Sequence, residues 1–150
     1  MMKSKAGKKK KMVRRKTARV ALNSTVSRRK KPPELKHLAW ETVEREILTP
    51  LFERQLIVGQ QVMLARILLR KGCIVPMHSH INEQVSTILE GTLKFFIDGK
   101  EILVGPGEIL TIPPNMPHKA EAMSDVLAID IFTPPRADWI NKTDSYLRSK

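Results

Sequence analysis

Three of the four histidines in the chain are spaced as the ligands of a metal ion would be. His78 and His80 are separated by one residue, Gln84 follows on the same stretch, and His118 lies further along the chain. Because side chains alternate between the two faces of a β-strand, His78 and His80 point the same way if they lie on one strand. Imidazole nitrogens and an amide oxygen suit zinc and first-row transition metals. The sequence therefore predicts a metal site formed by His78, His80, Gln84 and His118.

Three nitrogens and one oxygen leave coordination positions open for water or a substrate. Because Gln84 is neutral, the metal keeps more of its charge than it would beside a carboxylate, so a bound water is more acidic and a bound anion is held more strongly. The ligand set suits a divalent zinc, nickel, manganese or iron ion and does not choose among them. A shift of one residue would bring Glu83 to the metal instead, although strand alternation favours Gln84. His37 has no such neighbours, and we interpret it as structural.

Short stretches of apolar or alternating residues must position these side chains. We predict strands over residues 61–70, 84–89, 93–97, 101–104, 108–112, 117–122 and 126–132. The first of these is apolar enough to be buried on much of both faces. Many short strands at close spacing favour an all-β sandwich or a small barrel. The candidates for the wall of its pocket are Met63, Arg66, Met77 and Trp139.

The turns are better defined than the two ends of this region. Asp98-Gly99 is typical of a type I′ hairpin, in which both central residues have positive φ. Residues 35–48 fit one face of a helix, a strand or an irregular wrapping segment. Residues 139–147 fit either a short helix or an arm that wraps around the domain.

The positive charge is concentrated at the N-terminus. Residues 1–31 contain 14 Lys and Arg and no Asp or Glu, whereas the remaining residues contain 13 Lys and Arg against 15 Asp and Glu. Residues 1–31 also contain few large apolar side chains, and burying these few cannot offset the chain entropy lost on folding. We therefore predict a disordered basic arm over residues 1–33, followed by a single folded domain over residues 34–150.

The arm has several interpretations. A block of lysines and arginines makes non-specific contacts to nucleic acid or to another anionic surface, and residues 3–31 would make them here. An organelle transit peptide, a solvated tail without a role, and a true start at Met12 are the alternatives.

The rest of the composition restricts the compartment. Cys73 is the single cysteine, so no intrachain disulfide forms, as is usual in a reducing compartment. No apolar run approaches the roughly 20 residues that span a bilayer, and no apolar segment of a secretory signal is present. These features favour a cytoplasmic protein without a transmembrane segment.

Two motifs of the chain resemble the two conserved motifs of the cupins. The first is Gly72-x5-His78-x-His80-x3-Gln84-x6-Gly91, with Gln84 where many cupins have Glu. The second is Gly107-x5-Pro113-x-Asn115-x2-His118, with Asn115 where the motif usually has a glycine. Asn tolerates the left-handed conformation that glycine adopts at such a turn. The resemblance implies a double-stranded β-helix, that is, a jelly-roll barrel, with the metal inside its mouth, a small-molecule substrate and a homodimer.

A narrower resemblance involves Asp130, Phe132 and Arg136, which match the Asp-x-Phe-x3-Arg residues of KdgF-like pectin-degradation cupins. Those proteins convert cyclic 4,5-unsaturated uronates to linear ketonised sugar acids. The resemblance implies that Asp130 moves a proton and that the Arg136 guanidinium binds the uronate carboxylate with both of its prongs. In the structural interpretation, Asp130 pairs with Arg136 and Phe132 is a core residue.

Two other functions stay open at this point. Three histidines with an open position also suit an iron-dependent cupin dioxygenase. The third hypothesis is a ligand-binding cupin without enzymatic activity, which the basic arm tethers to nucleic acid or to a membrane.

Overall fold

The computed structural model describes residue 32 and residues 34–148. Apart from Pro32, the predicted arm lies outside these residues, so its disorder, its contacts and its boundary stay predictions. The described part of the domain that follows is mostly β-structure, with one short α-helix and two 3-10 turns.

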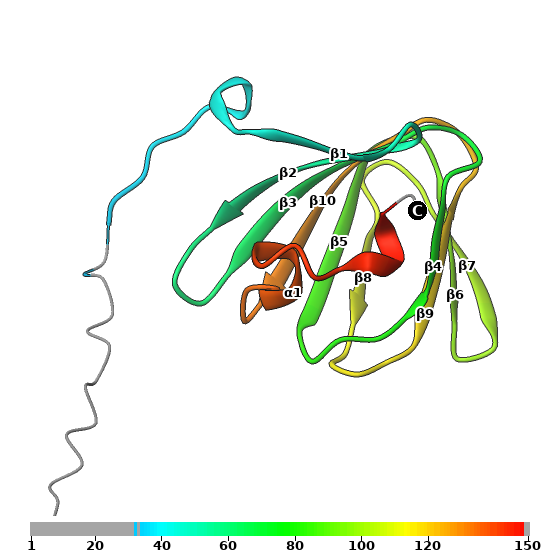
Figure 1. The fold of residues 1–150 in the computed structure, drawn as a ribbon. Coiled ribbons are helices and arrows are strands. Elements are labelled where there is room, and N and C mark those ends of the chain that lie inside the picture. The colour runs from blue at the N-terminus through cyan, green and yellow to red at the C-terminus, as the bar shows by residue number, and fades with distance from the viewer. Residues whose placement is uncertain (1–31, 33, 149–150) are drawn as a thin grey trace, which may run out of the picture. The chain divides into compact units, whose positions relative to one another are not determined.

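Within the described residues, ten strands form two antiparallel sheets that face each other (Figure 1). The six-stranded sheet has the order β1-β2-β3-β10-β5-β8, with bounds β1 (Arg45–Thr49), β2 (Phe52–Val58), β3 (Met63–Leu69), β10 (Val126–Thr133), β5 (Glu83–Glu90) and β8 (Ile109–Ile112). The four-stranded sheet has the order β4-β9-β6-β7, with bounds β4 (Ile74–His78), β9 (His118–Ala122), β6 (Leu93–Ile97) and β7 (Lys100–Val104). This is the jelly-roll barrel of the cupin fold that the sequence predicted.

Side-chain alternation along the strands builds the core between the sheets. In β3, Met63, Ala65 and Ile67 are buried, whereas the residues between them lie on the outer face and are partly exposed. The strand is therefore fully buried on one face only, not on much of both faces as its apolar run suggested. The same period of two holds for β6 and β10, so each strand contributes one face to the shared core.

Two of the predicted turns have the expected backbone. Asp98 and Gly99 have φ values of 51° and 70°, the pair of positive angles that a type I′ hairpin requires, and they join β6 to β7. Asn115 has φ of 62°, which is the left-handed conformation predicted for it. This second turn comes just before His118 and so helps to position it.

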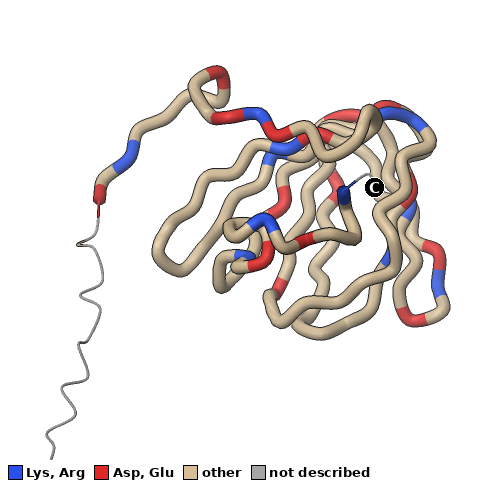
Figure 2. Tube along the Cα trace, viewed as in Figure 1, with Lys and Arg blue, Asp and Glu red and all other residues tan. Residues whose placement is uncertain are grey.

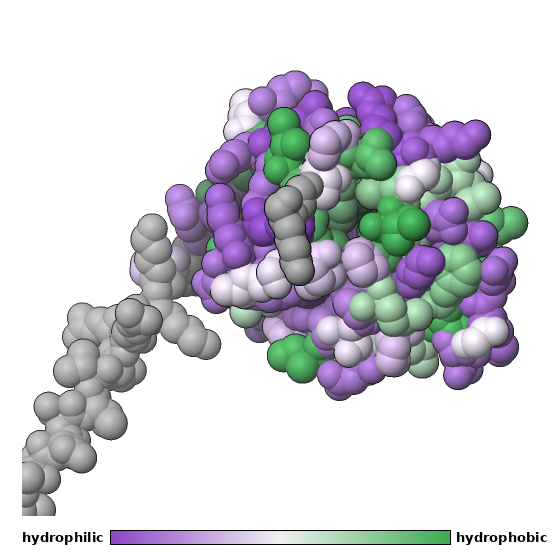
Figure 3. Space-filling view, turned by 45° about the vertical axis from the view of Figure 1, so that its right-hand side comes forward, coloured by the Kyte–Doolittle hydropathy of each residue, from purple (hydrophilic) through white to green (hydrophobic). Residues whose placement is uncertain are grey.

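The surface of the barrel is mixed in character. Charged residues of both signs alternate along the trace (Figure 2), as the near-neutral charge of the domain predicts. On the side that brings the four-stranded sheet forward, hydrophobic residues are scattered among hydrophilic ones (Figure 3). None of the helices in the described part of the chain has the length and apolarity needed to cross a bilayer.

The two ends of the domain, for which the sequence left alternatives, combine short helical turns with extended segments. Residues 35–48 contain a 3-10 turn, η1 (Trp40–Thr42), and the start of β1, so the strand alternative is correct for the second half. Strand β2 was not predicted. After β10 the chain forms helix α1 (Ala137–Ile140) and a 3-10 turn η2 (Ser145–Leu147), so the C-terminal region combines a short helix with a wrapping segment.

A buried ionic cluster fastens this C-terminal segment to the barrel. Arg54 of β2 pairs with Glu46 at 2.8 Å and with Asp144 at 2.7 Å. Arg148 pairs with the same two carboxylates, at 2.7 Å and 2.9 Å. Two positive and two negative groups thus neutralise each other, and the Arg54 guanidinium also lies 4.4 Å from the centre of the Trp139 ring. The cluster holds residues 137–148 against the barrel interior.

Candidate metal centre

The structure brings His78, His80 and His118 together at one end of the barrel. One ring nitrogen of each residue lies within 4.8 Å of the corresponding atoms of the other two. His78 ends β4 and is the cross-strand partner of His118, which begins β9. His80 lies in the loop after β4, so the prediction that one strand carries both His78 and His80 was wrong. The loop supplies the convergence instead, and the Asn115 N–H donates to the His80 carbonyl at 2.7 Å to fix it.

A backbone carbonyl orients each of the three rings in the same way. The Nδ1 atoms of His78, His80 and His118 lie 2.8, 3.0 and 2.8 Å from carbonyl oxygens two residues away in the sequence. A carbonyl only accepts, so each Nδ1 carries the proton and each Nε2 keeps a lone pair. Proteins orient metal-binding histidines in this way, with a hydrogen bond at the ring nitrogen that does not bind the metal.

The histidines are neutral at physiological pH. Burial lowers the pKa of His78 to about 4, with the nearby His118 acting in the same direction. Burial and the positive charge of Arg136 lower the pKa of His80 to about 4 as well, and burial lowers the pKa of His118. A neutral imidazole is the form that binds metal, so no proton has to leave at pH 7.

Gln84 faces the three histidines, and its neighbour Glu83 does not. Gln84 is 5% exposed and its Oε1 lies 3.2 Å from the His80 Nε2, whereas Glu83 is exposed on the other side of β5. With the His80 proton on Nδ1, two lone-pair atoms face each other there. Among the described residues, the buried His118 Nε2 has no hydrogen-bond partner either. A cation between these atoms would satisfy all of them, so the donor set fits the divalent metal that the sequence predicts.

Further into the barrel, the histidines border a cavity of about 40 Å³. Asp130 and Arg136 line it together with His78, Gln84 and His118. Trp139 and Leu147 line it from the C-terminal segment.

Arg136 uses most of its donors within the protein. Its Nε and Nη2 donate to the two Asp138 carboxylate oxygens at 2.9 and 2.6 Å, and Nη2 also donates to the Tyr146 hydroxyl at 2.8 Å. The two-pronged edge expected to bind a substrate is therefore occupied by Asp138. Only Nη1 is buried and without a partner in the described structure, so its two N–H groups remain for a ligand.

Asp130 and Phe132 share the inner face of β10, as strand alternation predicts. Burial raises the pKa of Asp130 to about 6, although a hydrogen bond from Ser86 and the charge of Arg136 act in the opposite direction. Phe132 is 1% exposed and packs between His80, 5.7 Å away, and Trp139, 5.0 Å away, measured between ring centres. Asp130 can thus exchange a proton near neutral pH, and Phe132 forms part of the support behind the histidines.

Comparison with known proteins agrees with this architecture. Residues 65–132 match the family model described as the cupin domain. The chain contains a cupin domain. The match includes the three histidines and Gln84, and it ends before Arg136.

Known relatives of this cupin domain show its fold and leave its reaction open. An RmlC-like cupin from Shewanella frigidimarina is 27% identical, with a TM-score of 0.66 over 71% of this chain and 97% of that one. KdgF from Halomonas sp. is 21% identical, with a TM-score of 0.66 over 71% of this chain and 99% of that one. An uncharacterized protein of Methanocaldococcus jannaschii is 29% identical over 86 residues, which is 57% of this chain and 69% of that one.

Several residues around the cupin site escaped the sequence analysis. Ser86 accepts a hydrogen bond from Gln84 at 2.9 Å, and its position two residues further on the same strand face was a usable signal. Tyr146 stacks on His78 with 4.8 Å between ring centres, and nothing in the sequence pattern indicated it. Asp138 pairs with Arg136, and the spacing of only two residues between an arginine and an aspartate was a usable signal for this pair.

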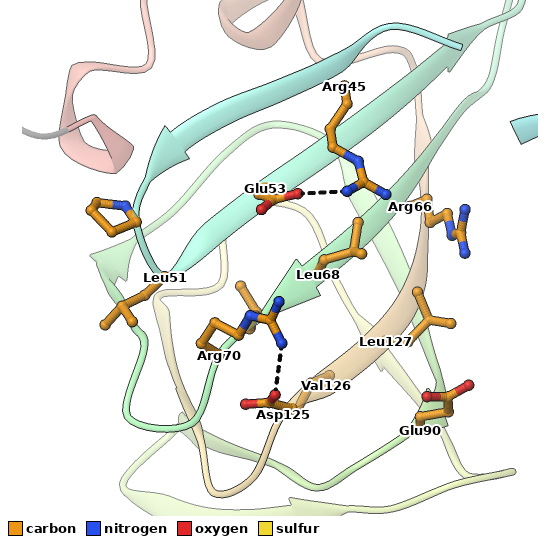
Figure 4. Close-up of a pocket in the computed structure, with 12 residues that line it drawn as sticks. Arg45, Leu51, Glu53, Arg66, Leu68, Arg70, Glu90, Asp125, Val126 and Leu127 are labelled. Atoms are coloured by element: carbon orange, nitrogen blue, oxygen red, sulfur yellow. Dashed lines mark hydrogen bonds and ion pairs between the residues drawn. The ribbon is translucent and has the colours of Figure 1, made fainter. Parts of the chain in front are cut away.

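Of the four residues predicted to form the pocket wall, only Trp139 lines the cavity. Met63 is fully buried, and Met77 is 57% exposed on the outside. Arg66 lies on the outer face of β3, in a second and larger hollow (Figure 4). The prediction for Arg66 was wrong because Arg66, three residues after Met63, lies on the opposite face of the strand.

This outer groove has a volume of about 360 Å³ and lies over β1, β2, β3 and β10. Leu68 and Leu127 are among its apolar residues. Four of its charged groups form pairs, Arg45 with Glu53 at 3.2 Å and Arg70 with Asp125 at 2.9 Å, and Arg66 and Glu90 also line it (Figure 4).

Proposed function

We propose that this cupin domain is a metal-dependent enzyme that converts cyclic 4,5-unsaturated uronates to linear ketonised sugar acids. The observation that carries the proposal is a cluster of three neutral histidines, two of which line a cavity together with a carboxyl group whose pKa lies near 6 and a buried guanidinium with one unpartnered NH₂ group. The KdgF-like residues Asp130, Phe132 and Arg136 support the choice of substrate.

The conversion is an isomerisation and needs no oxidant. The hydroxyl group on the anomeric carbon loses its proton, and the bond from that carbon to the ring oxygen breaks. A proton is then added to the carbon of the double bond that does not carry the ring oxygen. Asp130 is the group in the cavity that could accept and return such a proton. The Arg136 Nη1 would donate to the uronate carboxylate through its own N–H groups, because Asp138 holds the Nε–Nη2 edge.

His78, His80, Gln84 and His118 would hold the metal, which supplies Lewis-acid polarisation of the substrate oxygens. The aromatic rings of Phe132 and Trp139 would keep water away from the reacting atoms. Because the same ligands suit zinc, nickel, manganese and iron, the proposal covers any of these as the divalent cofactor.

The size of the cavity adds a requirement. A volume of about 40 Å³ accommodates only about three water molecules, each of which needs roughly 10–15 Å³ measured in this way. A sugar acid is much larger, so the C-terminal segment that carries Trp139 and Leu147 must move aside for it. The proposal therefore includes an open form in which Trp139 and Leu147 move outward to admit the substrate, and a return of the segment over the substrate before it reacts.

The direct test uses purified full-length protein loaded separately with each candidate metal. Unsaturated galacturonate or mannuronate is added, and the loss of the double-bond absorbance is followed. We expect acceleration that depends on both the metal and Asp130, with Asp125→Asn as the matched control in the outer groove. A decay no faster than with metal alone would contradict the proposal, and oxygen uptake by the iron-loaded protein would favour a dioxygenase.

We also propose that a second copy of the chain covers the outer face of the six-stranded sheet. Antiparallel sheets that face water are polar on that side. Here β3 and β10 instead direct aliphatic side chains outward, namely Leu64, Leu68, Leu127, Ile129 and Ile131. The groove has equal numbers of positive and negative groups, Arg45, Arg66 and Arg70 against Glu53, Glu90 and Asp125, which makes it self-complementary across a twofold axis.

A further inference from the structure

Ser86 lies between the candidate metal ligand Gln84 and the candidate proton carrier Asp130. It is fully buried, and it follows Gln84 by two residues on the inner face of β5. In the pairing of β5 with β10, Ser86 is directly opposite Asp130. The Gln84 Nε2 donates to the Ser86 Oγ at 2.9 Å, and the Ser86 side chain forms a hydrogen bond with the Asp130 carboxylate.

These contacts fix which way the Gln84 amide points. A hydroxyl group has one proton to donate, and a carboxylate only accepts. The Ser86 proton therefore goes to Asp130, and the Ser86 oxygen can only accept. Because the amide nitrogen of Gln84 is its only donor, the nitrogen must face Ser86 and the oxygen must face His80.

The direction matters because only one end of an amide can bind a metal ion. An amide oxygen has lone pairs, whereas the NH₂ group presents two protons. If the amide were reversed, it would point these protons at the three histidine nitrogens and at any cation between them. A glutamate at this position would have two equivalent oxygens and would need no such orientation.

We propose that Ser86 is a positioning residue that holds the Gln84 amide with its oxygen toward the metal. The inference rests on the proposed role of Gln84 as a metal ligand, and it assigns to Asp130 and Ser86 a structural task at the metal site. Partners that orient a ligand from behind typically change metal affinity 10–100-fold when they are removed. We expect a loss within that range for Ser86→Ala.

A double-mutant cycle distinguishes orientation from packing. The dissociation constant for Co²⁺ is measured by its visible absorption in the full-length protein, in the Ser86→Ala variant, in the Gln84→Glu variant and in the double variant. Ser86→Ala should weaken binding about 10–100-fold beside glutamine and less than about threefold beside glutamate. Thr87→Ala, on the outer face of the same strand, is the control and should leave the affinity unchanged.

Two results would overturn the inference. The first is an unchanged affinity in Ser86→Ala, and the second is an equal loss beside glutamine and glutamate, which would mean that Ser86 acts by packing. Gln84→Ala separates this failure from failure of the proposed ligand set. If Gln84→Ala binds Co²⁺ as the unaltered chain does, then Gln84 is not a ligand and both proposals fall. If it binds more weakly while Ser86→Ala does not, then only the inference about Ser86 is wrong.

Discussion

The cavity inside the barrel and the groove on its outer face differ in whether their polar groups have partners within the protein. The groove is about nine times larger, at roughly 360 Å³ against 40 Å³, and four of its charges pair with each other in contact with solvent. In the cavity, the His118 Nε2 and the Arg136 Nη1 are buried and lack partners among the described residues. Buried polar atoms without partners cost free energy, so they indicate a missing ligand better than the size of a hollow does.

The largest expected effect is on metal binding at the inner site. His118→Ala removes a ligand outright, so we expect affinity to fall by more than the roughly 10–100-fold that changes behind a ligand produce. Arg70→Ala in the groove should not alter it. Titration calorimetry with Zn²⁺ measures both, and equal affinities for the two variants would remove the distinction between the regions.

The buried ionic cluster should respond much more strongly than the groove to loss of one charge. Arg54 and Asp144 are inaccessible to solvent, so Arg54→Met leaves two carboxylates short of a positive partner. We expect a loss of about 3–5 kcal/mol in the free energy of unfolding. The exposed pair of Arg70 with Asp125 is worth less than about 1 kcal/mol. Urea denaturation compares Arg54→Met with Arg70→Ala, and similar losses would contradict this ranking.

The two aspartates should give pH dependences of opposite sign. The pKa of Asp130 is raised from 3.8 to about 6, so the metal-free protein loses stability as pH rises between these values, by about 3 kcal/mol. Asp130→Asn removes that loss and should be more stable than the unaltered chain at pH 7, with the gap closing toward pH 4. The histidines titrate equally in both proteins and cancel in the comparison.

Asp125 in the groove is the control for this experiment. Hydrogen bonds from the Lys71 backbone and from Arg70 lower its pKa, so it contributes stability that is present at neutral pH and lost in acid. Asp125→Asn should therefore be slightly less stable at pH 7. Thermal unfolding with a chelator present measures both variants, and shifts of the same sign would show that the environments were assigned wrongly.

The smallest expected effect on stability comes from a substitution in the outer groove. Leu127→Glu places a charge in the proposed contact between two copies and should halve the mass measured by light scattering. Monomer stability should change by less than about 1 kcal/mol, as is usual at a surface position. Ile74→Glu, at an exposed position on the four-stranded sheet, is the control. A monomeric unaltered chain would refute the proposed pairing.

Local patterns were sufficient for the parts of the fold that depend on neighbours in sequence. The type I′ turn at Asp98-Gly99 and the alternation of β6 and β10 follow from two or a few adjacent residues. The sequence also selected the three histidines that converge, although it attributed their convergence to a strand. Ser86 could have been found by extending the same period of two from Gln84.

Long-range pairing explains what the sequence could not predict. Strand β2 contains Arg54, whose inward direction makes sense only with Asp144 opposite it, ninety residues later. A polar residue in the middle of a strand argues against burial unless its partner is known. The stacking of Tyr146 on His78 is likewise set by where the C-terminal segment lies, whereas Asp138 reaches Arg136 from only two residues away.

The position of the C-terminal segment also gives assembly of the centre an order in time. During synthesis from the N-terminus, His78, His80, Gln84 and His118 are all made before residues 137–148, which later cover them. The Glu46–Arg148 pair, 102 residues apart, forms after every ligand has emerged. A metal ion can therefore reach the half-built barrel through an end that is still uncovered, and the ionic cluster closes behind it.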